Sequence, residues 1–207
     1  MYDIPSRLVE TAIQEISRLP GIGRKTALRL VLHLLRKDTG EALALGQAII
    51  QMREQIVFCR ECHNISDHEL CQICANPSRD ERLICVVADV RDMLAIENTQ
   101  LFKGKYHILG GVISPIEGIS PDQLHIHSLV KRTHATPVDE ILLALPSTVE
   151  GDTTNFYVYN QLKDSNIRLT ILARGIAVGD GLEYTDEVTL GRSILQRLPF
   201  TASLGRT

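Results

Sequence analysis

Residues 19–30, LPGIGRKTALRL, form a glycine-bracketed turn that leads into a basic, leucine-rich segment. Pro20 ends a first helix, and Gly21 and Gly23 permit the backbone angles of a tight turn. Apolar residues recur at helical intervals on both sides of this turn: Leu8, Ala12, Ile16 and Leu19 before it, and Ala27, Leu28, Val31, Leu32 and Leu35 after it. The stretch therefore predicts a helical hairpin whose second helix begins near Arg24.

The hairpin also concentrates positive charge. Six Lys or Arg residues and no acidic residue lie in residues 18–37, so this window is +6; because the whole chain has a net charge of −3, the remainder carries −9. The first amides of the second helix are left bare, and such a helix end attracts anions. Lys25 and Arg29 are four residues apart, so both can reach one sugar-phosphate backbone. A nucleic-acid phosphate is the expected ligand of Gly21, Gly23, Arg24, Lys25 and Arg29; a solvated basic helix face and a plain packing turn are the alternatives.

The next feature is a pair of CxxC motifs separated by eight residues: Cys59, Cys62, Cys71 and Cys74. Four thiolates make the closed tetrahedral shell that zinc takes in structural sites, so we expect a structural zinc ion with no open catalytic position. Two disulfides or coincidental thiols are the alternative. His63 and His68 are not needed as ligands and are expected to be surface loop residues. Cys85 lies in the apolar run LICVV and is expected to be buried in a strand.

Beyond Pro77 the pattern predicts an α/β sheet. Short apolar runs occupy residues 83–89, 106–111, 140–145 and 168–173, and residues 90–100, 120–134 and 153–164 between them have helical character. Continuous apolar strands separated by helices indicate a parallel sheet covered on both faces. Functional residues in such sheets usually lie beyond the carboxyl ends of the strands. The two stretches at these ends are VVADVRD (86–92) and LPSTVEGDTT (145–154). His125 and His127 lie two apart on an expected helix, which favours a solvated face over a metal site.

The chain is long enough, and with 44% hydrophobic residues apolar enough, to bury a real core. No apolar run approaches the roughly 18 residues of a membrane span, and MYDIPSRLVE lacks the pattern of a secretory signal, so we expect a cytoplasmic protein. Neither a GxSxG elbow nor a GxxxxGK[ST] loop is present. The tail, EYTDEV followed by TLGRSILQRLPF, predicts a helix that packs on a neighbouring subunit or on its own domain.

The order of these parts closely resembles the RecR family of bacterial recombination mediators over nearly the full chain. The stretches that carry the resemblance are LPGIGRKTALRL, CQIC, YHILGGVISPIEGI and LEYTDEVTLGR. It implies a helix-hairpin-helix module at residues 1–55, a four-cysteine zinc module at 56–77, a Toprim domain at 80–175 and a C-terminal segment at 176–207 that makes a subunit contact.

The resemblance also implies a function, namely DNA repair without catalytic turnover. Family members assemble into rings, usually tetramers, act with RecO and in many bacteria RecF, and help to load RecA onto single-stranded or gapped DNA coated by single-strand-binding protein, so a nucleoid association during repair is expected. A single hairpin offers few phosphate contacts, and several hairpins in one ring would add avidity.

Carried over by position, Lys25 and Arg29 match the family's DNA-binding cations, and the four cysteines match its zinc ligands. The set of acidic residues typical of Toprim domains is incomplete in this chain. The first strand of such domains ends in a glutamate, where this chain has Ala88. Asp89 cannot replace it, since neighbouring strand residues point to opposite faces. Glu150 and Asp152 remain: they are expected to hold Mg²⁺ weakly, to contact RecO, or to be helix N-terminal acids. The alternative function is a metal-dependent Toprim nuclease or topoisomerase-like enzyme.

Overall fold

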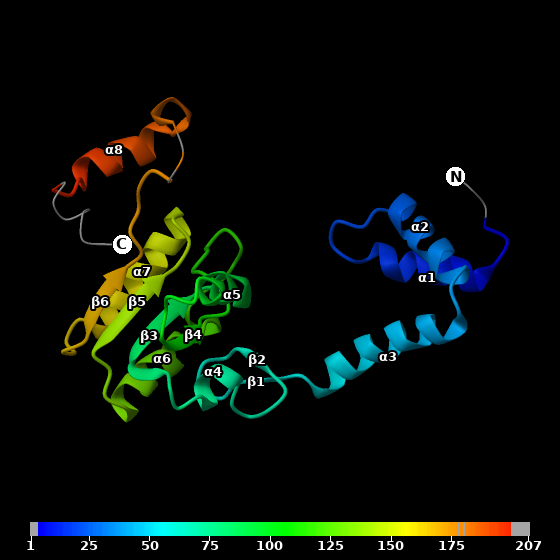
Figure 1. Cartoon of the computed structure of the whole chain (residues 1–207), viewed down its shortest axis with the longest axis horizontal. Coiled ribbons are helices and arrows are strands. Elements are labelled where there is room, and N and C mark those ends of the chain that lie inside the picture. Colours follow the sequence, from blue (N-terminus) through cyan, green and yellow to red (C-terminus); the bar gives the residue numbers. More distant parts are fainter. Residues whose placement is uncertain (1–3, 178, 180, 200–207) are drawn as a thin grey trace. The chain divides into compact units, whose positions relative to one another are not determined.

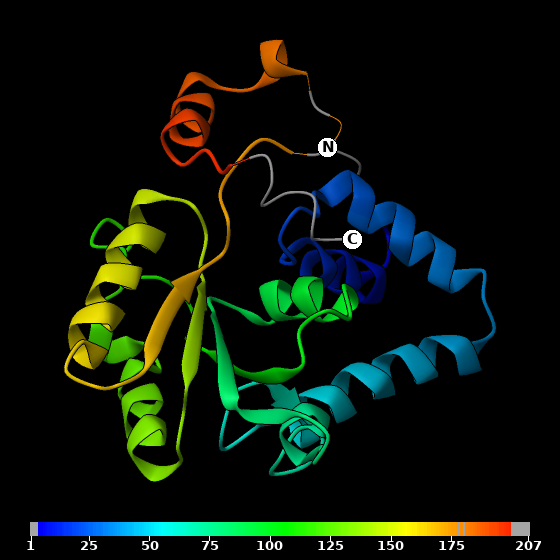
Figure 2. The same cartoon turned by 60° about the vertical axis from the view of Figure 1, so that its left-hand side comes forward.

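The computed structural model describes residues 4–177, 179 and 181–199. The chain divides into two compact units, Met1–Val57 and Phe58–Thr207. Each unit has its own hydrophobic core, and Figures 1 and 2 show the elements that build it.

The described residues of the N-terminal unit form the helices α1 (Arg7–Ser17), α2 (Arg24–Leu35) and α3 (Thr39–Gln55). The predicted hairpin is confirmed: α1 and α2 pack together through Ile13, Ala27 and Val31, which are buried, and α2 begins at Arg24. The hydroxyl of Ser6 accepts a hydrogen bond from the Val9 amide and caps α1, so the first helix has a defined start.

Helix α3 has no counterpart in the sequence expectations. Its apolar side chains are spread around the helix and none of its residues is buried, so it lacks the one-sided periodicity that marks a packed helix. Its start is nevertheless locally encoded, since the Asp38 carboxylate accepts a hydrogen bond from the Gly40 amide at 2.7 Å.

A small cysteine-containing module follows α3. Strands β1 (Val57–Phe58) and β2 (Ile65–Ser66) pair as a two-stranded sheet, and the one-turn helix α4 (Gln72–Ala75) comes next. Sequence periodicity cannot detect elements this short. Together they place two CxxC segments close to each other.

The second unit contains a sheet of four parallel strands, as predicted, and the structure gives their order as β4-β3-β5-β6. Its strands are β3 (Asp80–Val87), β4 (Gly104–Ile108), β5 (Glu140–Ala144) and β6 (Arg168–Ile171). The connecting helices are α5 (Val90–Asn98), α6 (Ile126–Ala135), which follows the short 3-10 helix η1 (Pro121–Gln123), and α7 (Val149–Leu162).

Helices lie on both faces of the sheet. Leu129 of α6 and Val158 of α7 pack against Ile84 and Ile141 on one face, while Met93 of α5 joins a second cluster on the other. Cys85 belongs to that second cluster and is completely buried, as expected, and burial raises the pKa of its thiol to about 12. The thiol is therefore protonated and inert at neutral pH.

The described part of the tail contains the 3-10 helix η2 (Leu182–Tyr184) and α8 (Glu187–Leu195). The Asp186 carboxylate caps α8 by accepting a hydrogen bond from the Thr189 amide at 2.9 Å, which confirms the predicted helix. No residue of α8 is buried. Within the described part of the chain, no helix combines the length and hydropathy that a membrane crossing requires.

Candidate nucleic-acid interface and metal centre

The turn between α1 and α2 exposes its backbone at two glycines. Gly21 has φ +77°, a left-handed conformation that favours glycine, and Gly23 is the N-cap of α2. No side chain among the described residues caps α2, so its first amides are free for an outside acceptor. An added Cβ at either glycine would have no heavy atom within 4 Å, which leaves the turn open to a ligand.

The basic residues of α2 differ in how they are held. The Arg24 guanidinium donates to both oxygens of the Glu10 carboxylate, at 2.7 and 2.8 Å, and this hydrogen-bonded pair lowers the pKa of Glu10. The expected phosphate ligand Arg24 is thus already engaged between the two helices. Lys25 and Arg29 are exposed, and the described residues give neither of them an ion-pair partner.

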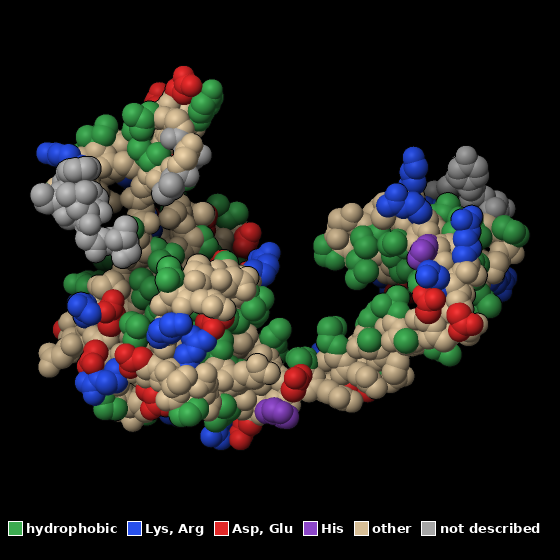
Figure 3. Space-filling view, in the orientation of Figure 1, with side chains coloured by type: hydrophobic (Ala, Val, Ile, Leu, Met, Phe, Trp, Pro, Cys, Tyr) green, Lys and Arg blue, Asp and Glu red, His purple; other side chains and the backbone are tan. Residues whose placement is uncertain are grey.

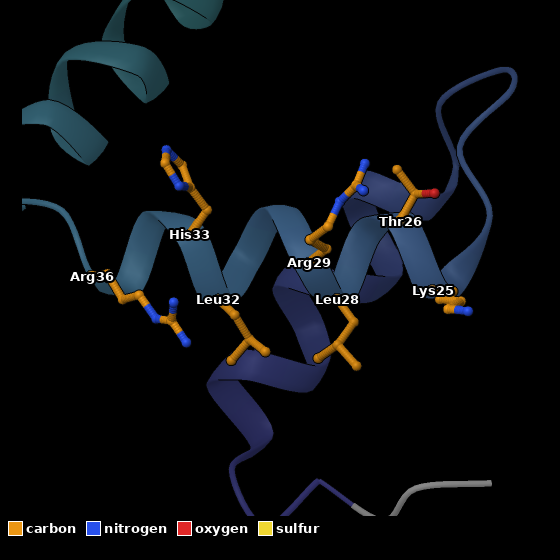
Figure 4. Close-up of a pocket in the computed structure, with 7 residues that line it drawn as sticks. All are labelled: Lys25, Thr26, Leu28, Arg29, Leu32, His33 and Arg36. Carbon is orange, nitrogen blue, oxygen red and sulfur yellow. The ribbon is translucent and has the colours of Figure 1, made fainter.

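Lys25 and Arg29 line one hollow of about 470 Å³ on the surface of α2, so the structure brings these two predicted residues together (Figure 4). The other residues that line this hollow are Thr26, Leu28, Leu32, His33 and Arg36. In Figure 3, both units carry Lys and Arg side chains as well as acidic side chains.

The four predicted metal ligands also come together. The sulfur atoms of Cys59, Cys62, Cys71 and Cys74 all lie within 4.8 Å of one another, and all four residues are buried. All four are free cysteines rather than disulfide partners, so the disulfide alternative is wrong. Four buried sulfur donors fit a tetrahedral metal ion, and a shell that they fill leaves no position for water or substrate.

Histidines next to this cluster are more closely packed than the sequence indicates. His63 was expected to be a surface loop residue, but its ring stacks on that of His125 with centroids 3.8 Å apart. Its Nε2 atom lies 2.8 Å from the Ser128 hydroxyl oxygen. The expectation is therefore wrong for His63, which is half-buried. His125, the N-cap of α6, is exposed like His68 and His127, as expected, although its ring stacks on that of His63.

A backbone hydrogen bond also joins the cysteine-containing module to the sheet. The Ile108 amide of β4 donates to the carbonyl oxygen of Cys62 at 2.9 Å, and Arg132 of α6 donates to the carbonyl oxygen of Tyr106 at 2.8 Å. The predicted metal ligand Cys62 thus accepts a hydrogen bond from the last residue of β4, which lies 46 positions later in the sequence (62 to 108). The cysteine cluster is therefore held against β4, the edge strand of the sheet.

The acids beyond the strands do not converge. Ala88 is buried at the end of β3, and Asp89 caps α5 by accepting hydrogen bonds from the Arg91 and Asp92 amides. Glu150 and Asp152 lie in the first turn of α7, where residues two apart are about 200° apart around the helix axis. The cysteine cluster is the one group of three or more metal-ligating side chains found among the described residues.

Asp152 is engaged with Arg174, which precedes the C-terminal segment. Arg174 Nη1 donates to Asp152 Oδ2 at 3.1 Å, and this hydrogen-bonded pair lowers the pKa of Asp152. Gly151 between the two acids is required by packing, because a Cβ there would lie 1.9 Å from the carbonyl oxygen of Pro146. The EGD turn therefore serves packing and pairing, a role that local sequence does not reveal.

Comparison with known protein families gives four consecutive matches along the chain. They are the RecR helix-hairpin-helix at residues 9–53, the four-cysteine zinc finger domain of RecR at 56–76, the Toprim domain at 82–173 and the RecR C-terminal segment at 175–197. Both the hairpin and the cysteine cluster fall within matched segments that describe such features.

Individual relatives agree over almost the whole length. The chain is 56% identical to Recombination protein RecR of Bacteroides fragilis over 200 residues, which cover 97% of this chain and 98% of the relative. It is 58% identical to the Flavobacterium johnsoniae protein of the same name, covering 96% of each chain. The Porphyromonas gingivalis (strain ATCC 33277) protein of that name is 52% identical, covering 97% of each.

Proposed function

The chain belongs to the RecR family of recombination proteins, and from this we propose that it is a non-enzymatic, DNA-binding mediator of recombinational repair. The observation that carries the proposal is the hairpin turn, where uncapped α2 amides adjoin two exposed cations, Lys25 and Arg29. Backbone amides and cations that contact phosphate carry no base information, so binding is independent of sequence and strongly dependent on salt.

Each part of the turn has a distinct role in this proposal. The amides after Gly23 donate hydrogen bonds to a phosphate oxygen, assisted by the positive end of the α2 dipole. Lys25 and Arg29 hold the adjacent backbone. Arg24 acts as a brace rather than a phosphate ligand, because its guanidinium is already bonded to Glu10.

We assign the cysteine cluster to a structural Zn²⁺ ion. The four sulfur atoms supply a complete donor set, and when bound, zinc would link the two CxxC segments and stabilise the module. The Cys62 carbonyl bond to β4 then extends this order to the edge of the sheet.

The acid arrangement supports a mediator over a Toprim-type nuclease or topoisomerase-like enzyme. Metal-dependent phosphoryl chemistry requires convergent carboxylates, whereas Asp152 is paired with Arg174 and Ala88 offers no ligand. We propose that Glu150, and not the Asp152 held by Arg174, contacts RecO, and that the two acids do not form a catalytic Mg²⁺ site.

The remaining partners follow from family membership as proposals. The protein would assemble as a ring, most simply a tetramer, and would act with RecO, and with RecF where that protein is present. Together they would load RecA onto single-stranded or gapped DNA that single-strand-binding protein covers. Several hairpins in one ring would convert weak individual contacts into firm binding by avidity.

A gel-shift and cleavage experiment tests the proposal. Labelled duplex, gapped and single-stranded DNA is incubated with the protein and Mg²⁺, using Lys25→Ala with Arg29→Ala as the test variant. The matched control is Lys37→Ala, which removes a cation that is ion-paired with Glu41 in the same basic window. Shifts lost in the test variant alone, without cleavage products, support the mediator; metal-dependent products that vanish in Asp152→Ala contradict it.

Assembly and partner contacts need separate measurements. Light scattering with and without gapped DNA gives the number of subunits, and hence of hairpins, in one particle. A RecO binding assay compares the wild type with Glu150→Gln, which removes charge but keeps shape. Unchanged RecO affinity in this variant would contradict the proposed acidic contact.

A further inference from the structure

The hollow on α2 extends well past the hairpin turn. Besides Lys25 and Arg29, it is lined by Leu28, Leu32, His33 and Arg36, so it reaches the last turn of the helix (Figure 4). We propose that residues 28–36 of this face form a second contact strip, which binds single-stranded DNA leaving the hairpin turn. This inference rests on the proposed function, because it assumes that the turn holds a DNA phosphate.

The charges of the strip are available to an external anion. No acidic residue occurs in residues 24–37, and the described residues provide no ion-pair partner for Arg29 or Arg36. The cations that flank them differ, since Arg24 is paired with Glu10 and Lys37 with Glu41. The unpaired cations of α2 are thus the ones that line the hollow, which is the distribution expected of a polyanion site.

The apolar residues of the strip indicate what kind of nucleic acid fits. Figure 4 shows Lys25, Leu28, Leu32 and Arg36 as one row along α2 and Thr26, Arg29 and His33 as another. The side of a duplex offers a leucine only sugars and charged phosphates. An unpaired strand also offers the apolar faces of its bases, so Leu28 and Leu32 can be covered while Arg29 and His33 contact phosphates.

The length and shape of the strip agree with this. Lys25 and Arg36 are eleven positions apart in the sequence, which corresponds to about 16 Å along the helix axis. At a rise of about 3.4 Å per stacked nucleotide, this accommodates about five nucleotides, and fewer when the strand is extended. A duplex backbone curves away from a straight helix over such a distance, whereas a flexible single strand can follow it.

The test compares two strip variants with two matched controls in the full-length protein. Leu32→Asn alters a strip residue that is 43% exposed, and Leu30→Asn alters a neighbour outside the hollow that is 37% exposed. Arg36→Ala removes a strip cation, and Lys37→Ala removes the paired cation beside it. Fluorescence anisotropy measures binding to labelled oligothymidine and to a duplex of equal length, with circular dichroism melting and light scattering for every variant.

We expect Leu32→Asn to weaken oligothymidine binding about fivefold, from the loss of apolar contact. Arg36→Ala should lower the slope of log affinity against log salt by about 0.7 for the single strand. Duplex affinity should change by less than about twofold, and both controls should match the wild type.

Other outcomes overturn the inference, and they identify what replaces it. Equal losses on the single strand and the duplex would make the strip a general phosphate contact. Unchanged DNA affinity with a changed particle mass would mean that a second copy of the chain covers the leucines. If Lys25→Ala with Arg29→Ala weakens binding while the strip variants match their controls, the strip alone fails; if that double variant binds normally, the proposed function itself fails.

Discussion

Replacing Gly23 with alanine should separate DNA binding from folding more cleanly than removing a charge. Gly23 has φ −80° and ψ 163°, which any residue can adopt, and its added Cβ would meet no heavy atom within 4 Å. Alanine is a poorer N-cap than glycine, but it also lowers the entropy of the unfolded chain; the two effects are each below about 1 kcal/mol and oppose each other. The free energy of unfolding should therefore change by less than about 0.5 kcal/mol.

Binding should change far more. An added methyl group at the N-cap of α2 is expected to crowd a phosphate that the first α2 amides hold. Loss of one hydrogen bond to a charged acceptor costs about 1.5–3 kcal/mol, which is about a 10- to 100-fold loss of affinity at each hairpin. Gly21→Ala provides the contrast: at φ +77° alanine carries about 1–2 kcal/mol of strain, so this variant should lose stability as well.

Fluorescence anisotropy with labelled DNA, measured at several salt concentrations, gives the affinity, and thermal unfolding of the same samples gives the stability. The Gly23→Ala variant should have the same melting temperature as the wild type and should bind DNA at least about tenfold more weakly. Wild-type affinity in a Gly23→Ala protein of unchanged melting temperature would refute the role of the amides, and the cations alone would then have to account for binding.

Three further predictions concern the paired charges and the metal centre. Arg24→Ala should weaken DNA binding less than Lys25→Ala, because the Arg24 guanidinium is held by Glu10; anisotropy at matched salt compares the two variants. Asp152 has its pKa lowered from 3.8 by Arg174, so the stability from this pair is complete above about pH 5 and is lost as the pH falls through the lowered folded-state value. Melting temperatures of the wild type and Asp152→Asn should therefore converge in acid, and a constant difference would contradict this. A strong chelator should release one equivalent of zinc per chain, expose four thiols to a thiol reagent and lower the melting temperature, since ligation and folding are coupled.

The sequence predicts those parts of the fold whose signals are local. The hairpin follows from Pro20, two glycines and helical apolar spacing, and the cysteine cluster follows from two CxxC pairs. The parallel strands follow from continuous apolar runs. Helix α3 is not predicted, because none of its residues is buried and its apolar residues therefore do not follow a one-sided pattern.

What the sequence could not show is pairing between distant residues. Arg24 meets Glu10 across the hairpin, and His63 meets His125 across 62 positions of sequence (63 to 125), so no local pattern reports either contact. For the same reason the basic window identified the cations of α2 but not which of them are free. Arg36 belongs to that window, and only the three-dimensional arrangement places it in the hollow with Lys25.

The Asp152–Arg174 pair engages one of the acids that lie beyond the carboxyl ends of the strands. A carboxylate that binds a catalytic metal must keep its oxygens free and must converge with others, and Asp152 does neither, because Arg174 occupies it and Glu150 lies on another side of α7. The charge is used instead to tie the end of the sheet to the segment that leads to α8. If this reasoning holds, restoring a glutamate at Ala88 should not create metal-dependent activity unless Arg174 is also replaced, since the arginine would still neutralise the second acid.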